Sequence, residues 1–395
     1  MRLHSFLLAG LCLLGTVVAQ DEEDPPEEPE PEPEPEPPAP LPTGVDPFAN
    51  ATVFQPANAS DQVSYGRTEN LPNNTLLAAW SDFQANDTIS IYRSTNNGFS
   101  WYPWGTATSD VAGRRLVQPH LLYVNETFGE EAAGTTLLAV NAVDDRSTNI
   151  ELYASADQGE SWDFVARIAE GGRANTTNGA TPVWEPFLFL HNGRLICYYS
   201  DQRDPQHGQK LVQQTATGNF ATWGPAIDVV ASQVYEDRPG MATVAKLPNG
   251  QYIIVFEYAM LKNATTKTYR YPIYYKLVAD PENAATQPVH ELKVNTGAQP
   301  NGGPTVTYTP VGGDAGTIVV SDSDSNSVFI NQAFGQGVWR EVKTTAGRAY
   351  SREVRIPDND QTKLRFIGGA EYGQETPSQI LVTVMDLEKA IKVIP

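Results

Sequence analysis

An internal repeat constrains the fold of this chain more than any other feature of its sequence. Residues 94–101 (STNNGFSW) and residues 155–162 (SADQGESW) share the pattern S-x-[DN]-x-G-x-S-W, which ends at Trp101 and at Trp162. Trp223 continues the series at the same interval, in a segment where the rest of the pattern has decayed. A period of about 60 residues is longer than a helical repeat and is typical of a multi-stranded sheet unit such as the blade of a β-propeller.

The period also predicts the number of sheet units. A fourth tryptophan, Trp339, follows Trp223 at nearly twice the interval, as expected if one mark between them is missing. The chain from Asp46 to its C-terminus at Pro395 has room for six such periods. We therefore predict an all-β fold, a six-bladed β-propeller over residues 45–395. The alternative is a pair of β-sandwiches in which four of the seven tryptophans are regularly spaced by chance.

The repeated residues have a structural explanation of their own. An Asp or Asn followed two positions later by Gly favours a tight turn, because its side chain caps backbone N–H groups, and the tryptophan can then pack back between hairpins. We expect the marked residues on the outer hairpin turn of each blade and outside any functional site. These residues are Asn96, Trp101, Asp157 and Trp162.

Apolar runs that each follow a turn predict strands throughout the body of the chain. Examples are residues 75–80, 136–141, 251–256 and 316–321. Asn-Gly pairs at 192–193 and 249–250 lie between apolar segments, so they predict two-residue hairpin turns, and their separation is close to one period. A helix is expected only near the C-terminus, at residues 386–392.

The N-terminus predicts export. Residues 1–19 combine Arg2 and His4 with an apolar run at 6–14 and a small-residue cleavage site at 17–19, which is the pattern of a secretory signal peptide. The run is too short to span a bilayer. Seven Asn-x-Ser/Thr sequons fit a glycosylated, extracellular protein that has no membrane segment.

Residues 20–44 have a different composition from the rest of the chain. They alternate Pro with Glu, and the ten acidic residues between positions 21 and 36 carry half of the formal net charge of −20. Such a segment buries too little apolar surface to fold, so we predict a disordered, extended, acidic arm. Basic residues are not clustered anywhere in the sequence, which argues against nucleic acid or an anionic membrane as a partner.

Two glutamates stand at apolar runs and are the candidates for catalysis. Glu185 lies in residues 182–188 (PVWEPFL) and Glu257 in residues 252–258 (YIIVFEY). The innermost strands of a propeller converge on one axis, so residues about one blade apart in sequence can meet there. A glutamate in this position either caps a strand in solvent or is held at a functional axis.

The segments around the two glutamates favour the functional axis, because a strand end in solvent does not require a polar cluster beside it. Arginine together with aromatic and carboxylate groups is typical of a sugar-binding pocket. Segments of this composition are residues 65–67 (YGR), 198–203 (YYSDQR), 237–242 (DRPGMA) and 350–355 (YSREVR).

An ordered set of motifs around the glutamates resembles a known family. The motifs are WEPF at 184–187, YSDQR at 199–203, GQKL at 208–211, RPGM at 238–241, LPNG at 247–250, EY at 257–258 and YSR at 350–352. In this order they resemble the fungal exo-arabinanases of glycoside hydrolase family 93, over the whole body of the chain. The resemblance implies a six-bladed, sialidase-like propeller with Asp-boxes that cleaves α-1,5-linked L-arabinan from its non-reducing end with retention and releases arabinobiose.

The resemblance also implies site residues. The two catalytic glutamates of the family match Glu185 and Glu257, and a retaining glycosidase needs two carboxyl groups about 5 to 5.5 Å apart, one as nucleophile and one as acid/base. The sequence leaves open which glutamate has which role. Candidates for substrate binding are Arg67, Trp184, Asp201, Arg203, Arg238, Tyr350 and Arg352. For three of the arginines a structural pair is the alternative: Arg203 with Asp201, Arg238 with Asp237, and Arg352 with Glu353.

Two other functions compete with this prediction. A sialidase would share the propeller, but sialidases carry an Arg-Ile-Pro motif near the start of the domain, whereas here the triplet occurs only in the last blade, at 355–357. A carbohydrate-binding propeller without catalysis would not require two glutamates in apolar strands.

Metal sites find little support in the sequence. Residues 322–326 (DSDSN) begin like a calcium loop, but Ser327 and Ala333 stand where Gly and Glu are needed. We therefore expect no metal or cofactor. The expected partner is the arabinan substrate, and the protein is expected to be a monomer.

Overall fold

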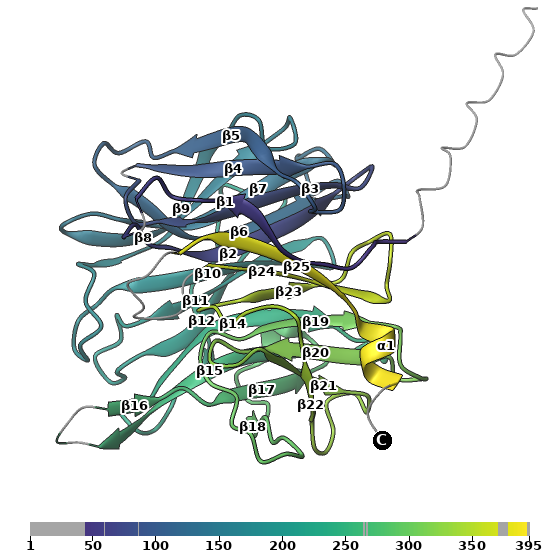
Figure 1. The fold of residues 1–395 in the computed structure, drawn as a ribbon. Helices are drawn as coiled ribbons and strands as arrows, with labels where there is room; N and C mark the ends of the chain where they lie inside the picture. Colours follow the sequence, from purple (N-terminus) through teal and green to yellow (C-terminus); the bar gives the residue numbers. More distant parts are fainter. Residues whose placement is uncertain are drawn as a thin grey trace, which may run out of the picture. The chain divides into compact units, whose positions relative to one another are not determined.

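Six antiparallel sheets make up the described part of the chain, and their strands are arranged as blades around one axis (Figure 1). The computed structural model describes residues 44–58, 60–85, 87–263, 265, 268–369 and 378–392. The predicted signal peptide, and the predicted acidic arm as far as residue 43, lie outside the described residues. The prediction of a six-bladed all-β propeller is confirmed.

The blades follow one another along the chain, and each begins with its innermost strand. The first three blades are β2 (Val63–Leu71), β3 (Thr75–Asp82), β4 (Thr88–Ser94) and β5 (Tyr102–Thr108); β6 (Arg115–Val124), β7 (Thr135–Val143), β8 (Ser147–Ser155) and β9 (Asp163–Gly172); and β10 (Val183–His191), β11 (Arg194–Asp201), β12 (Lys210–Thr217) and β13 (Ile227–Val230).

The remaining three blades differ in detail. They are β14 (Arg238–Lys246), β15 (Tyr252–Asn263), β17 (Ile273–Val278) and β18 (His290–Glu291), with β16 (Thr268–Arg270) paired to β15; β19 (Thr305–Thr309), β20 (Thr317–Ser321), β21 (Ser327–Asn331) and β22 (Arg340–Lys343); and β23 (Glu353–Arg355), β24 (Lys363–Gly368), β25 (Ile380–Asp386) and β1 (Phe48–Phe54). A 3₁₀ turn, η1 (Pro281–Asn283), precedes β18, and a short helix, α1 (Leu387–Lys392), follows β25 as predicted.

The core consists of six apolar clusters, each between two neighbouring blades. A blade is therefore buried on both faces, which explains why its strands are continuous apolar runs rather than alternating ones. In β3, for example, the first seven of eight residues are buried.

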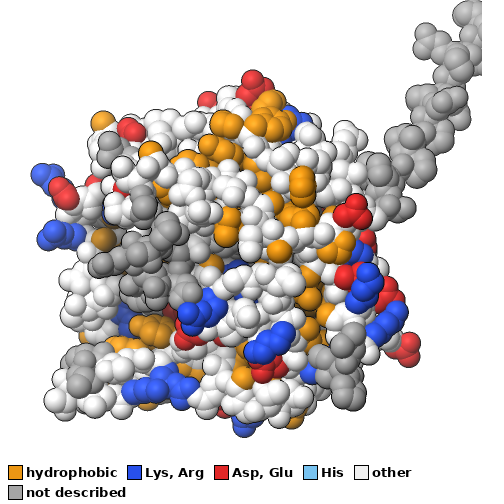
Figure 2. Space-filling view, in the orientation of Figure 1, with side chains coloured by type: hydrophobic (Ala, Val, Ile, Leu, Met, Phe, Trp, Pro, Cys, Tyr) orange, Lys and Arg blue, Asp and Glu red, His pale blue; other side chains and the backbone are white. Residues whose placement is uncertain are grey.

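Across the residues that the structure describes, no helix has the length and apolar character needed to span a bilayer. On the face drawn in Figure 2, acidic and basic side chains are interspersed.

The repeated tryptophans lie where the sequence predicted them. Each follows the third strand of its blade, and the fourth blade is the one that lacks the mark between Trp223 and Trp339. In the first repeat, the Ser94 hydroxyl accepts a hydrogen bond from the Gly98 N–H at 3.0 Å, and Trp101 Nε1 donates to the Gly98 carbonyl at 2.9 Å. Equivalent bonds in the second repeat show that the motif fixes a turn.

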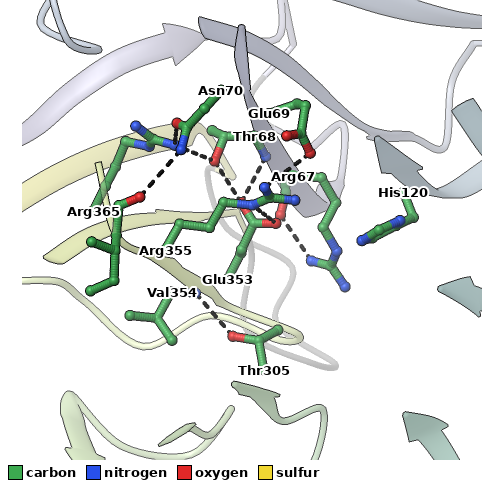
Figure 3. Close-up of polar contacts among 12 residues, drawn as sticks. Arg67, Thr68, Glu69, Asn70, His120, Thr305, Glu353, Val354, Arg355 and Arg365 are labelled. Carbon is green, nitrogen blue, oxygen red and sulfur yellow. Dashed lines mark hydrogen bonds and ion pairs between the residues drawn. The ribbon is translucent and has the colours of Figure 1, made fainter. Parts of the chain in front are cut away.

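The ring is closed by both ends of the folded region. β1, which precedes the first blade in the sequence, pairs antiparallel with β25 of the last blade, with Ala51 opposite Val382 (Figure 1). Buried charges join the inner strands of the same two blades (Figure 3). Glu353 accepts from the Thr68 N–H and hydroxyl, both at 2.7 Å, and from Arg355 Nε at 3.1 Å, while Arg355 pairs with Glu69 at 2.9 Å.

Glu353→Ala is expected to lower the free energy of unfolding by about 3 kcal/mol, because it leaves the Thr68 N–H and part of the Arg355 charge buried without a partner. Urea denaturation followed by tryptophan fluorescence measures the change. Glu388→Ala is the control, because it breaks an exposed Glu388–Lys392 pair worth about 0.5 kcal/mol or less. Equal losses for the two variants would contradict a stabilising role for the buried charges between β2 and β23.

Candidate active site

The innermost strands of the first four blades each carry a β-bulge, and one residue of each bulge has a positive φ. These residues are Tyr65 (φ 53°), Gln118 (φ 53°), Glu185 (φ 62°) and Met241 (φ 55°). In the last two blades, Gly303 (φ 43°) and Ser351 (φ 54°) precede the innermost strand. A bulge bends its strand and re-aims a side chain, and non-glycine residues in this strained region are concentrated at functional sites. Glu185 therefore lies in a bulge near the start of β10 and does not cap a strand end.

Glu185 accepts hydrogen bonds from two hydroxyl groups. Tyr65 Oη donates to its Oε1 at 3.3 Å and Ser200 Oγ donates to its Oε2 at 2.9 Å. Burial raises the pKa of Glu185 above its ordinary value, although these two donors and the charges of Arg238 and Arg67 oppose the rise. The hydrogen-bond donors and the cations favour an ionised carboxylate at this position.

Glu257, on β15 of the next blade, has a different environment. Its side chain is 7% exposed, and its Oε2 accepts one hydrogen bond, from the Gly303 N–H at 2.9 Å. Burial, followed by the negative charge of Glu185, raises the pKa of Glu257 to about 8. The structure therefore brings the two predicted catalytic glutamates into electrostatic contact and favours the protonated form of Glu257.

Glu257→Gln is expected to raise the melting temperature at pH 8 but not at pH 4.5. A carboxyl whose pKa is raised on folding contributes stability that is fully present below its ordinary pKa of 4.5 and is lost as the pH rises through about 8. The neutral amide does not titrate, so the gap between variant and wild type should widen with pH. Calorimetry at pH 4.5, 6 and 8 measures it, and a gap that does not change with pH would contradict the raised pKa.

Arg238 and Trp184, two of the predicted substrate-binding residues, are linked through one side chain. Both donate to Gln202 Oε1 at 2.9 Å. Arg238 also donates to Asn178 Oδ1 and Gln209 Oε1, both at 2.8 Å. Its charge lowers the pKa of both glutamates. The alternative pair of Arg238 with Asp237 does not form, because Asp237 accepts from Ser232 Oγ.

Arg67 and Tyr350 also lie at this site. Arg67 donates to the Ser351 carbonyl at 2.8 Å and to its hydroxyl at 2.6 Å, and its charge reaches Glu185. The rings of Tyr350 and Tyr65 pack edge to face at 5.3 Å. Tyr350 is close enough to Glu185 and Glu257 for their charges to raise its pKa, although burial is the larger cause.

Three predicted substrate-binding residues have other contacts. Asp201 and Arg203 form the structural pair that was the alternative, with an ion pair at 2.6 Å. Arg352 is 1% exposed, and it donates to the Gly347 and Ser327 carbonyls. The expectation that Arg352 binds substrate hydroxyls is therefore corrected to a structural role, because its guanidinium points into the last two blades.

Sequence reasoning missed Gln118 and Gly303, and it assigned no individual role to four further residues around the glutamates that lie in the motifs it singled out: Tyr65, Ser200, Gln202 and Gln209. One signal was available. Pro119 and Pro186 directly follow Gln118 and Glu185 within apolar segments, and proline inside a strand pattern indicates a bulge. Across the described ranges, no group of three or more His, Cys, Asp or Glu side chains is arranged to hold a metal ion.

No family model and no curated protein matches the chain. The structure is similar to that of a Penicillium chrysogenum alpha-L-arabinanase in complex with arabinobiose, with a TM-score of 0.83 and 41% identity over 87% of this chain and 99% of that one. It is equally similar to the GH93 alpha-L-arabinofuranosidase of Fusarium graminearum in complex with arabinobiose, with a TM-score of 0.83, 36% identity and the same coverage. NanB sialidase from Streptococcus pneumoniae, with a TM-score of 0.58 and 10% identity, shares the fold alone.

Proposed function

The chain belongs to glycoside hydrolase family 93, and from this membership and the geometry of its two glutamates we propose that it hydrolyses α-1,5-linked L-arabinan from the non-reducing end and releases arabinobiose. Two solved relatives with arabinobiose bound support this substrate. The observation that carries the proposal is a pair of buried, interacting carboxyl groups on neighbouring blades: Glu185 accepts from two hydroxyl groups, whereas Glu257 accepts from one backbone N–H and has a pKa raised to about 8. A retaining glycosidase needs this combination.

In the proposed mechanism Glu185 is the nucleophile. Its carboxylate attacks the anomeric carbon and forms a glycosyl–enzyme ester, while Glu257 transfers its proton to the glycosidic oxygen and the shortened arabinan leaves. Glu257, now ionised, takes a proton from water as the water attacks the same carbon. The ester bond breaks, Glu185 leaves as a carboxylate, and the sugar is released with its original configuration.

The bonding around the two residues supports this division of roles. Tyr65 and Ser200 donate to Glu185, which a carboxylate can accept on both oxygens. Glu257 has a single backbone donor on Oε2, and among the described hydrogen bonds its Oε1 accepts none, so that oxygen can carry the proton toward a leaving group. Arg238, held by three amide side chains and the Gly208 carbonyl, keeps a positive charge next to both carboxyls.

The size of the first product tests the proposed reaction. Purified protein is incubated with linear debranched arabinan, and the early products are separated by anion-exchange chromatography. The expected result is arabinobiose from the first minutes, with slow loss of polymer length. A ladder of longer oligosaccharides would replace the exo mode by internal cleavage, and no released sugar would refute the activity.

A tyrosine nucleophile of the sialidase type is the second candidate, because the Tyr65 hydroxyl contacts Glu185. In that mechanism Glu185 would remove the proton of Tyr65, and the phenolate oxygen would attack. Burial and the charge of Glu185 raise the pKa of Tyr65 well above its ordinary value, which disfavours the phenolate. Tyr65→Phe separates the two mechanisms, since it should retain measurable turnover if Glu185 attacks and none if Tyr65 does.

We also propose that the mature protein is exported as a monomer that begins near residue 20. N-terminal sequencing of the protein from the culture medium of a secreting host, together with light scattering, tests both points. Cell-retained protein that still contains residues 1–19 would refute export, and a stable dimer would refute the monomer.

A further inference from the structure

Gln118 connects three blades beside Glu185. It occupies the bulge of β6, and its side chain contacts Tyr65 on β2 and Glu185 on β10. Gln118 Oε1 accepts from the Glu185 N–H at 3.0 Å and from Asn141 Nδ2 at 3.0 Å. Gln118 Nε2 lies 3.3 Å from Tyr65 Oη.

These contacts determine which way the amide of Gln118 points. A backbone N–H can only donate, so the amide oxygen must face Glu185 and the NH₂ group must face Tyr65. The phenolic oxygen of Tyr65 then accepts a proton from Gln118. Tyr350 also hydrogen-bonds to the Tyr65 hydroxyl, and this bond lowers the pKa of Tyr65 and raises that of Tyr350, as expected if Tyr350 donates. The single hydroxyl proton of Tyr65 is then left to be donated to Glu185 Oε1, 3.3 Å away.

The surroundings of Gln118 hold this arrangement in place. Its own N–H donates to Ser81 Oγ at 2.7 Å, and both Ser81 and Asn141 are fully buried. Its backbone has a φ of 53°, in a region that few non-glycine residues adopt. Hydrogen bonds from two blades therefore position the Gln118 side chain, whose amide group contacts Tyr65 and the Glu185 N–H.

We infer that Gln118 is a positioning residue that holds Tyr65 as a permanent hydrogen-bond donor to Glu185, and so favours the ionised form of the Glu185 carboxyl. The positioning itself follows from the contacts; its consequence for catalysis rests on the proposed function. An ionised Glu185 that is already oriented by Tyr65 is ready to attack an anomeric carbon.

Gln118→Glu tests the inference with a change of one polar group. The carboxylate of the variant can still accept from the Glu185 N–H and Asn141, but it now competes for the Tyr65 proton and adds a negative charge beside Glu185. The protonation midpoint of Glu185 should rise by about one pH unit. Tyr65→Phe removes the donor alone and should also raise the midpoint, so the test does not depend on one variant folding.

The midpoint is read from the infrared carboxylate band, as the difference between spectra with and without Glu185→Gln. All proteins carry Glu257→Gln, which removes the coupled carboxyl. Gln214→Glu is the matched control, because Gln214 also contacts a tyrosine hydroxyl, that of Tyr199 at 2.7 Å, and it has no contact with Glu185. The control should leave the midpoint unchanged. An unshifted midpoint in either Gln118→Glu or Tyr65→Phe, or an equal shift in the control, would overturn the inference.

The titration needs no substrate, so it stands apart from the proposed function. With Glu257 intact, the acidic limb of kcat/KM on arabinan should move up in pH by the same amount in both variants. If the midpoint shifts in the titration but the wild-type enzyme, with Glu257 intact, releases no sugar, the proposed function is refuted and the positioning role is supported. An unshifted midpoint in an active enzyme would refute only the positioning role.

Discussion

Glu185→Gln is expected to lower kcat on linear arabinan by a factor on the order of 10⁴ or more, because the amide cannot form the glycosyl–enzyme ester. The fold should be unaffected, since the amide oxygen can still accept from Tyr65 and Ser200. Reducing-sugar release at high enzyme concentration measures the loss, and thermal unfolding checks the fold.

Glu291→Gln is the control for this substitution. Glu291 is exposed on β18, in the outer part of the fourth blade, and its replacement should leave kcat within a factor of about two. A Glu185→Gln enzyme that keeps a tenth of wild-type activity would remove Glu185 from the role of nucleophile.

Glu257→Ala is expected to lose a factor of about 10² to 10⁴ in kcat on arabinan, because the sugar alkoxide then leaves without a proton. The loss should be much smaller in the glycosylation step with an aryl arabinobioside, whose phenolate leaves readily. Azide should restore turnover of the aryl substrate and give the α-configured glycosyl azide, because a second displacement follows attack by Glu185.

The configuration of the azide product distinguishes the two assignments of roles. If Glu257 were the nucleophile, azide would replace it directly, in a single displacement, and the product would have the β configuration. Nuclear magnetic resonance of the purified azide decides between them. The same measurement on Glu185→Ala should give the β product. Each variant therefore serves as the control for the other.

The pH dependence of activity follows from the same two groups. Glu257 must be protonated, so kcat/KM should be lost as the pH rises through about 8. Glu185 must be ionised, so activity should also be lost at the acidic end. A basic limb that persists unchanged in Glu257→Gln with an aryl substrate would show that another group causes it.

The fold could be predicted from the sequence because its repeat is marked by local chemistry. The Ser–Asn/Asp–Gly–Trp turns depend on hydrogen bonds within a few residues, so the same residues recur wherever the turn recurs, as around Trp101 and Trp162. Continuous apolar runs gave the strands, because both faces of a blade are buried. The fourth blade lacks the tryptophan turn, but the interval between Trp223 and Trp339 still gave the correct number of blades.

The candidate site was predictable only in part, because it depends on backbone conformation and on contacts between blades. Glu185 and Glu257 were found from their apolar context. Gln118 was missed and Tyr65 was given no individual role, since a positive φ in a residue other than glycine leaves little local trace. Arg203 and Asp201 are two residues apart in an extended segment and lie on one side of it, so their pairing could have been expected.

Arg352 was misjudged for a related reason. Ser351 and Arg352 precede β23, and the positive φ of Ser351 (54°) redirects the chain at this point, so the sequence pattern alone does not show which side each side chain occupies. Ser351 takes the position that faces the site, where it binds Arg67, and Arg352 is turned inward to the Ser327 carbonyl. The neighbouring motif residues therefore have opposite environments.

The site is held in place at a cost in stability. Two coupled carboxyls are buried together and four inner strands contain strained bulge residues, which are features that stable folds avoid unless function requires them. Glu257→Gln is therefore expected to stabilise the protein at pH 8 and to lower its activity, because the same carboxyl causes both effects.

The configuration of the sugar at the moment of release tests the central claim most directly. Linear arabinan is mixed with the wild-type enzyme in D₂O, and the anomeric protons of the new reducing ends are followed by nuclear magnetic resonance before mutarotation. The account predicts that α-arabinobiose appears first and that the β-anomer grows in later, because two displacements at Glu185 retain the configuration. A β-anomer that appears first would show a single displacement by water and would contradict the role of Glu185 as nucleophile.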